Sequence, residues 1–400
     1  MPRVSAGILL VEGAAGLLEG RKPVGSIRIG RVAGINIYVH WSWFAIFALL
    51  TWWLSEGFFQ EVYEDWSKQE AWIVSVVTTL LFFSSVLLHE LSHSLVAKRL
   101  GLPVSHITLF IFGGVSALGG EPTSAKQEFQ VAIVGPLTSF ALAIVMGAAA
   151  GVAYWQDAKN EPWAAIAEYL AFINAAVGIF NLLPGFPLDG GRVLRATLWA
   201  RSGNMLKATR WAANSGTFIS FGLIALGVLS ILIGNVIGGA WFIVIGWFLR
   251  NASESSYQQL LFTRTLEGTR VGQIVNRDFH PAPPDITLSE MVRSYMIAQS
   301  QRCVPVVVAE ELIGLVSMGD MRRVPQEDWE TTSVFRAMTP HERLYTVAPQ
   351  DDLTTALEMM ATHDVHQLPV IDGRTFLGFV TRADVLRLIQ IRTELSGAKP

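Results

Sequence analysis

Residues 89–93 read His-Glu-Leu-Ser-His, and this run is the part of the chain best equipped for chemistry. Two imidazoles four residues apart lie on one face of a helix and can bind one zinc ion. Glu90 can act as the base that takes a proton from a water held at that metal. A lone five-residue match also occurs by chance in unrelated proteins. The alternative role for His89, Glu90 and His93 is a polar cluster satisfied inside a helical bundle.

A catalytic zinc site needs a third protein ligand and one open position. Asp189 is the best candidate, because Pro184 and Pro187 end an apolar run just before it and two glycines after it let the chain turn. Its alternative role is the N-cap of a helix over 192–200, and one carboxylate can fill both roles. Asn181 can donate hydrogen bonds to an oxyanion or to substrate backbone, or it can pack between helices through its amide.

The elements that position these residues are expected to be transmembrane helices. The chain has 400 residues, of which 51% are apolar and 16% charged, and its mean hydropathy is +0.39. Such values are typical of a polytopic membrane protein. Ionisable groups inside an apolar span are costly, so they call for a functional reason. Six spans are expected, at about 41–55, 72–97, 128–153, 163–183, 212–233 and 236–250.

Basic residues predict the orientation of the spans. They gather before the first span, after the second, after the fourth and at the end of the sixth, whereas the opposite loops are mostly acidic. By the positive-inside rule, both termini then lie in the cytoplasm of a multi-pass cell-membrane protein. His89 lies nine residues before Lys98, so the site is submerged but closer to the cytoplasmic face.

Two stretches between the spans alternate in polarity like strands. Residues 26–40 predict short strands with a turn at Gly34, and residues 104–120 predict a hairpin or a re-entrant loop beside the helix with the histidines. A cytoplasmic loop is the alternative for 104–120. Residues 1–25 are expected to form a poorly structured extension, without a signal peptide. The single cysteine, Cys303, excludes an internal disulfide and a cysteine-based zinc site.

The C-terminal part contains a weak internal repeat. Residues 314–320 (Gly-Leu-Val-Ser-Met-Gly-Asp) match 378–384 (Gly-Phe-Val-Thr-Arg-Ala-Asp), and 304–308 match 368–371 at the same offset. A helix-like apolar pattern precedes each copy. Two copies of one small α/β unit that pack together explain the pattern. Expected domains are 26–250 for the transmembrane part, 251–270 for a linker, and 271–330 and 331–392 for the two copies.

Taken together, the two polar motifs resemble the site-2 protease family of intramembrane zinc metalloproteases. The resemblance rests on His89-Glu90-Leu-Ser-His93 on one span and Asn181…Pro-Leu-Asp189-Gly on a later one, and it covers about residues 28–210. It implies that His89, His93 and Asp189 bind zinc and that Glu90 is the base. Gly135-Pro-Leu also matches, but Thr138-Ser139 follows where relatives often have Ala-Asn.

The C-terminal repeat resembles a pair of CBS motifs, as found in a subgroup of site-2 proteases. That resemblance implies an adenine nucleotide as a ligand of the pair. The residues implied to contact its phosphate or ribose are a Ser or Thr three positions before an Asp, and both copies keep them: Ser317, Asp320, Thr381 and Asp384. The alternative for each couple is a helix N-cap with its partner three residues on.

The sequence therefore predicts a polytopic α-helical membrane protein with a cytoplasmic α/β CBS-pair domain. The expected function is hydrolysis of a peptide bond in a transmembrane segment of another protein, with one zinc per chain. The expected partners are that membrane-spanning substrate, the lipid bilayer and a second copy of the chain bound through the CBS motifs. A nucleic-acid partner is not expected. The alternatives are a CBS-regulated ion transporter or channel that uses the histidines and carboxylates as an ion path, and a membrane-embedded peptidase for prenylated proteins or soluble loops.

Overall fold

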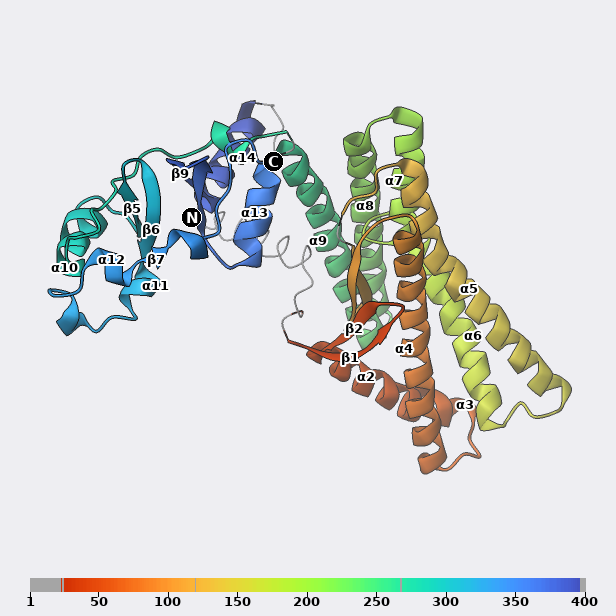
Figure 1. Ribbon diagram of the computed structural model, residues 1–400. Helices are drawn as coiled ribbons and strands as arrows, with labels where there is room; N and C mark the ends of the chain where they lie inside the picture. The colour runs from red at the N-terminus through yellow and green to blue at the C-terminus, as the bar shows by residue number, and fades with distance from the viewer. Residues whose placement is uncertain (1–22, 24, 119, 267, 396–400) are drawn as a thin grey trace. The chain divides into compact units, whose positions relative to one another are not determined.

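The computed structural model describes residues 23, 25–118, 120–266 and 268–395. Most of the expected N-terminal extension, residues 1–25, lies outside the described residues. The chain divides into two compact units, with the boundary after Leu261. The unit before the boundary holds the apolar spans, and the unit after it holds the repeat. Each unit is described by itself below (Figure 1).

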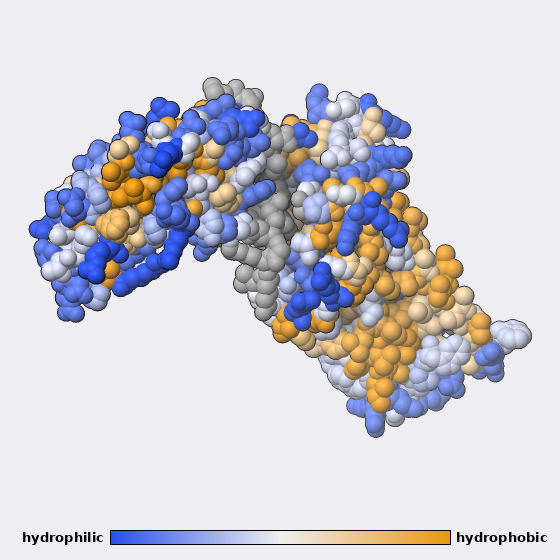
Figure 2. Space-filling view, viewed as in Figure 1, coloured by the Kyte–Doolittle hydropathy of each residue, from blue (hydrophilic) through white to orange (hydrophobic). Residues whose placement is uncertain are grey.

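Six helical segments of the first unit are long and apolar enough to cross a membrane, as the sequence predicts. They are Trp41–Val62, Lys68–Arg99, Ala125–Trp155, Pro162–Asn181, Met205–Leu232 and Val236–Gln258. The first is built from α2 (Trp41–Trp53), a π-helical turn (Leu54–Phe59) and α3 (Gln60–Val62), and the others are α4 (Lys68–Arg99), α5 (Ala125–Trp155), α6 (Pro162–Asn181), α8 (Met205–Leu232) and most of α9 (Val236–Leu266). Figure 2 shows apolar side chains gathered over the outer surface of these helices. The chain is a multi-pass membrane protein.

Helix α4 shows how the sequence separates a lipid-facing side from a protein-facing side. Ser67 and Glu70 form a capping box that begins the helix. Leu80, Leu81 and Leu88 of α4 are exposed in the isolated chain, as suits contact with lipid tails. Its buried side carries small and polar residues that let neighbouring helices approach; these include Ser75, Thr78, Thr79, Ser85, His89, His93 and Ser94. The histidines therefore point into the bundle.

A four-stranded sheet lies against α4 in this unit. Strands β1 (Ser26–Val32) and β2 (Ile35–His40) form the predicted hairpin, with its turn at Ala33 and Gly34. Strands β3 (Val104–Phe110) and β4 (Gly113–Leu118) form a second hairpin, so the prediction of a hairpin for 104–120 is confirmed. The strand order is β1-β2-β3-β4, with β2 and β3 parallel, and β4 is an edge strand over α4.

The chain between α6 and α8 folds back on itself. Helix α6 ends at Asn181, a compact loop follows, and α7 (Asp189–Ser202) begins at Asp189. Helix α7 packs against α5 and α8. Helix α9 continues to Leu266, so residues 251–266, expected as part of a linker, are helical.

The second unit contains two copies of one α/β motif, as the repeat predicts. In the first copy, β5 (Cys303–Val308) pairs with β6 (Glu311–Ser317), and in the second, β8 (Gln367–Asp372) pairs with β9 (Thr375–Thr381). The copies join through β6 and β9 and through a shared apolar cluster. The helices and short elements are η2 (Val271–Gln273), α10 (Leu288–Met291), η3 (Val292–Ile297), α11 (Met318–Met321), η4 (Gln326–Asp328), α12 (Val334–Ala337), β7 (Thr339–Pro340), η5 (His341–Arg343), α13 (Leu353–Thr362) and α14 (Arg382–Leu395).

Candidate metal centre

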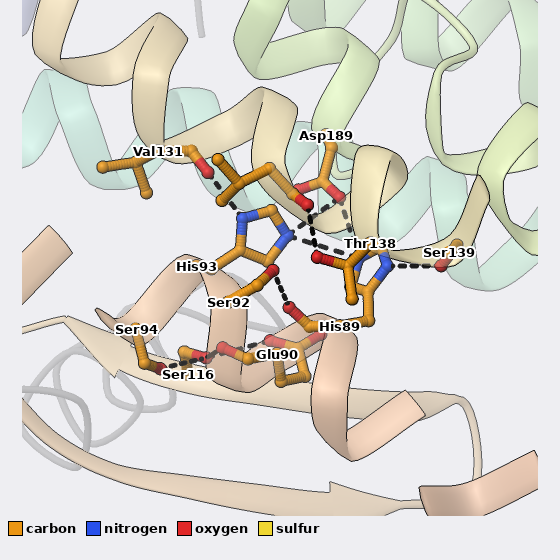
Figure 3. Close-up of polar contacts among 11 residues, drawn as sticks. His89, Glu90, Ser92, His93, Ser94, Ser116, Val131, Thr138, Ser139 and Asp189 are labelled. Atoms are coloured by element: carbon orange, nitrogen blue, oxygen red, sulfur yellow. Dashed lines mark hydrogen bonds and ion pairs between the residues drawn. The ribbon is translucent and has the colours of Figure 1, made fainter. Parts of the chain in front are cut away.

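Three side chains converge between α4 and the start of α7. His89 Nε2 and His93 Nε2 each lie 3.1 Å from Asp189 Oδ2, and the two nitrogens lie 3.2 Å apart. Both histidines are buried, at 5% and 4% exposure. Figure 3 shows the two rings and the carboxylate pointing at one another. Within the described residues, these three form the only cluster of histidine, cysteine and acidic side chains with metal-ligand spacing.

The spacing of these atoms fits zinc. Ligand atoms at about 2.0–2.1 Å from a tetrahedral ion lie about 3.3 Å from one another, close to the triangle seen here. A second observation comes from Gly135 of α5. A Cβ on Gly135 would lie 2.1 Å from His93 Nε2 and 2.6 Å from His89 Nε2. The missing side chain of Gly135 therefore leaves an open space between the two ring nitrogens.

Helix α5 also fixes which imidazole nitrogen faces the site. The backbone oxygen of Val131 lies 2.6 Å from His93 Nδ1, and Ser139 Oγ lies 2.9 Å from His89 Nδ1. A carbonyl can only accept, so His93 Nδ1 carries the proton and Nε2 offers its lone pair. Such partners hold the orientation of metal-binding histidines. The sequence prediction left the role of Ser139 open, and the structure gives it this contact.

The loop before α7 places the Asp189 carboxylate. Cβ atoms on Gly190 and Gly191 would lie 2.3 Å from backbone atoms of Leu182 and Gly185, so the folded-back loop requires glycine at both positions. Asp189 is the first residue of α7, and the N-cap is Leu188. The alternative of Asp189 as the N-cap of a helix over 192–200 is therefore wrong, because the helix begins three residues earlier than expected.

The carboxylate of Glu90 turns toward β4. Ser116 Oγ donates to Glu90 Oε2 over 2.9 Å, and Ser94 Oγ donates to Ser116 Oγ over 3.1 Å. Figure 3 shows this chain of hydrogen bonds between α4 and the strand. A Cβ on Gly114 would lie 2.4 Å from Glu90 Cγ, so the strand can lie this close only with glycine there. Glu90 is thus held beside the three converging side chains, without belonging to the trio.

The other predicted site residues do not join the cluster of His89, His93 and Asp189. Asn181 is the last residue of α6 and is partly buried, and the structure gives no hydrogen bond from its amide to His89, His93 or Asp189. In the second unit, Ser317 and Asp320 form a capping box at α11. Thr381 Oγ1 lies 2.6 Å from Asp384 Oδ2 in the same arrangement at α14. Both couples therefore have the capping geometry that was their alternative role.

Sequence reasoning missed three contributors to the centre, namely Val131, Ser116 and the open side of Gly135. Val131 acts through its backbone, which no side-chain pattern reveals. Ser116 belongs to the strand that was expected only as a hairpin. Gly135 offered a signal, because a glycine and a proline in mid-span are unfavourable for a helix and suggest a close approach.

Comparisons with known proteins show which families this chain resembles. The chain matches the model of Peptidase family M50 over residues 77–157 and 147–225, and that of the CBS domain over 271–327 and 334–391. A Mycobacterium tuberculosis relative named "Putative zinc metalloprotease Rip3" is 35% identical, over 92% of this chain and 93% of the relative. A Synechocystis relative described with the same function is 32% identical, over 93% and 98%. The solved Site-2 Protease from Methanocaldococcus jannaschii is 29% identical with a TM-score of 0.41, covering 58% of this chain and 95% of that one.

Six apolar helices and a match to a metallopeptidase family define the class as membrane-embedded zinc metalloproteases, here followed by an α/β tail. The chain belongs to peptidase family M50, the site-2 protease family of zinc metalloproteases, and it carries a tandem pair of CBS domains. The predicted family and the predicted class of enzyme are confirmed.

Proposed function

We propose that this protein is an intramembrane zinc endopeptidase that cleaves a transmembrane segment of another membrane protein. The observation that carries the proposal is the triangle of His89, His93 and Asp189, with ligand atoms 3.1–3.2 Å apart on apolar helices. One zinc ion per chain fits this triangle. An ion path through a transporter has no need for three ligand atoms at tetrahedral spacing.

In the proposed mechanism, His89, His93 and Asp189 would hold the metal, and Glu90 moves the proton. Zinc bound there would supply Lewis acidity to the scissile carbonyl and to the attacking water. Glu90 takes the proton of that water and passes it to the leaving nitrogen. Ser116 aims the Glu90 carboxylate through their 2.9 Å hydrogen bond. Asn181 is proposed to donate a hydrogen bond to the oxyanion or to the substrate backbone. This role requires the bound substrate to lie within hydrogen-bond reach of the Asn181 amide.

The edge strand β4 is the proposed docking element for the substrate. A helical substrate hides its peptide bonds, so it has to unwind locally before attack. An unwound segment can add to the free edge of a sheet as a further strand. Strand β4 pairs only with β3 among the described strands, and its Ser116 contacts Glu90. A substrate strand paired there lies next to the proposed base.

The direct test compares wild type with Glu90→Gln in proteoliposomes that contain a single-span test substrate. We expect Glu90→Gln to retain zinc and fold but to lose cleavage by a hundredfold or more, because an amide cannot take the proton. Ser92→Ala, also on α4, serves as the matched control, because the hydroxyl of Ser92 only donates to the backbone of its own helix. Activity of Glu90→Gln within tenfold of wild type would refute the assigned base. Zinc-independent cleavage would refute the metal mechanism.

We further propose that both termini lie in the cytoplasm and that the protein resides in the cell membrane. The support is the basic character of the loops on one side of the spans. Reporter fusions after residues 65, 158 and 235 should report the outside, and fusions after 125, 205 and 260 the cytoplasm. Inversion at all six positions would refute the orientation.

We also propose that the CBS pair binds an adenine nucleotide and thereby modulates proteolysis. Asp320 is buried and accepts from Ser317 and Thr339, whereas Asp384 is more accessible, so Asp384 is the proposed primary contact. A ligand shifts activity only if it prefers one conformation of the protein. Calorimetry of the full chain with AMP, ADP and ATP should detect binding that Asp384→Ala weakens and that Asp372→Ala, at an exposed position, leaves unchanged. No heat at millimolar nucleotide would refute the proposal.

A second copy of the chain is the other proposed partner, bound through the CBS domains. Light scattering of the purified protein, with the detergent contribution subtracted, should give twice the chain mass of 43.9 kDa. A chain truncated after residue 265 should give a monomer. Dimers of the truncated chain would move the interface to the membrane unit.

A further inference from the structure

A buried ion pair, which the proposed mechanism does not use, joins α5 to α7. Glu128 of α5 is fully buried, and Arg195 of α7 is 8% exposed. The Arg195 Nε and Nη2 groups both donate to Glu128 Oε1. Glu128 Oε2 has no hydrogen-bond partner. Burying two charges is expensive, and a hydrophobic pair of similar volume is often as stable, so a specific role has to explain this pair.

On α5, Glu128 shares a helix face with the residues that contact the histidines. Val131, Gly135 and Ser139 follow Glu128 at intervals of three, four and four residues, which is the spacing of one face of a helix. Val131 accepts from His93, Gly135 leaves the space between the rings, and Ser139 contacts His89. The position of α5 along α4 therefore sets the orientation of both imidazoles.

On the other side, Arg195 is tied to the loop that carries Asp189. Its guanidinium lies 5.1 Å from the centre of the Phe186 ring, a cation–π distance. Phe186 stands three residues before Asp189, and its own N–H donates to Ala212 of α8 over 3.1 Å. Arg195 thus joins the helix that orients the histidines to the loop and helix that supply the carboxylate.

We propose that Glu128 and Arg195 are a positioning pair that sets Asp189 against His89 and His93 and so tunes zinc affinity. The inference rests on the ligand set proposed above. Neither residue touches the metal or the substrate. The buried charges fix the distance between α5 and α7 by a forked, directional contact, which an apolar pair of the same volume could not do.

The experiment measures zinc in the purified full chain by competition with a chromophoric chelator. Glu128→Gln keeps the size of the side chain and removes its charge. We expect zinc affinity to fall at least tenfold, as is usual when a group that orients a metal ligand is changed. The visible spectrum of the cobalt-loaded variant should shift, because the geometry of coordination changes. Arg201→Gln, at an exposed position on the same helix, removes one charge and should leave both readouts unchanged.

A double-mutant cycle separates positioning from general loss of structure. If the pair acts through Asp189, then Glu128→Gln should have little effect on the residual zinc affinity of Asp189→Asn. Equal losses in both backgrounds would overturn the inference and make the pair merely structural. So would a cobalt spectrum like that of wild type. If Glu128→Gln does not fold, zinc affinity and the cobalt spectrum are measured on Arg195→Lys instead. Lysine keeps the positive charge but lacks the two nitrogen donors of the guanidinium. Wild-type zinc affinity of Arg195→Lys would likewise overturn the inference.

Failure of the proposed function gives a different result. If Asp189→Asn alone keeps wild-type zinc affinity, Asp189 is not a ligand and the proposed ligand set is wrong. If Asp189→Asn loses affinity while Glu128→Gln keeps it, the ligand set stands and only the positioning pair is refuted.

Discussion

A methyl group added at Gly135 should displace zinc without unfolding the protein. The Cβ of Gly135→Ala would lie 2.1 Å from His93 Nε2 and 2.6 Å from His89 Nε2. Carbon and nitrogen atoms in ordinary contact are about 3.5 Å apart. The overlaps are therefore about 1.4 and 0.9 Å, too large for a helix backbone to absorb. The methyl would fill the space between the two ring nitrogens, so one or both rings must rotate away.

The cost to metal binding should exceed the cost to the fold. Rotation of His93 breaks the 2.6 Å hydrogen bond to Val131, worth about 1 kcal/mol, and removes a ligand from the triangle. We expect zinc affinity to fall at least a hundredfold, or about 2.7 kcal/mol. Overpacking costs the fold about 1–3 kcal/mol, partly offset by the roughly 1 kcal/mol gained when alanine replaces glycine in a helix.

The assay combines zinc content after chelator challenge with thermal unfolding of the metal-free protein. Gly147→Ala is the matched control on the same helix, since its Cβ would lie 3.8 Å from Ala171 Cβ, an ordinary contact. The control should keep zinc and activity, whereas Gly135→Ala should lose both while its metal-free form unfolds within a few degrees of wild type. Wild-type zinc retention by Gly135→Ala would refute the placement of the metal between the two rings.

Two substitutions and the alkylation of Cys303 test other parts of the structure. Ser116→Ala should lower the rate of cleavage about tenfold at unchanged zinc content, because one hydrogen bond that aims Glu90 is lost; an unchanged rate would show that Ser116 does not aim the base. Ser139→Ala should weaken zinc binding about tenfold through His89, and equal zinc affinity would contradict this. Burial, reinforced by the charge of Asp320, raises the pKa of the Cys303 thiol to about 12. At pH 8, iodoacetamide should therefore alkylate native Cys303 at least a hundredfold more slowly than the denatured chain, in which about a quarter of the thiol is ionised. Between about pH 8.5 and pH 12 the thiol ionises only in the unfolded chain, and this ionisation stabilises the unfolded state. The contribution of Cys303 to the free energy of unfolding should therefore decline across this range and stay constant below about pH 7. Rapid alkylation of native Cys303 at pH 8 would contradict its raised pKa.

The spans and the repeat could be predicted because their signals extend over many residues. The first and sixth spans are longer than expected, since Glu56 and Glu254 interrupt the apolar runs where the helices continue. The offset of 64 residues between Val304 and Leu368 reappears as the offset between β5 and β8, because each copy buries its own strand pair. Patterns of this kind depend on averages, so single polar residues do not obscure them.

The start of α7 could not be predicted from the same patterns. Gly190 and Gly191 read as a break between a turn and a later helix, yet both belong to α7. Their lack of side chains serves the close approach of Leu182 and Gly185, not a turn. Glycine has the same appearance in a sequence whether it allows a positive φ or a tight contact, and only the packing distinguishes the two.

Helix α5 supplies no side chain to the metal triangle, yet it defines the site. It offers a backbone oxygen at Val131, an absent side chain at Gly135 and a hydroxyl at Ser139, all on one face. Ligand motifs mark only the residues that donate to a metal. A helix that orients those donors needs a spacing of three and four residues and a close approach, and many residue types satisfy that requirement. Substitutions on this face of α5 should therefore lower metal affinity more than they lower the stability of the fold. Substitutions on the lipid-facing side of the same helix should not show this difference.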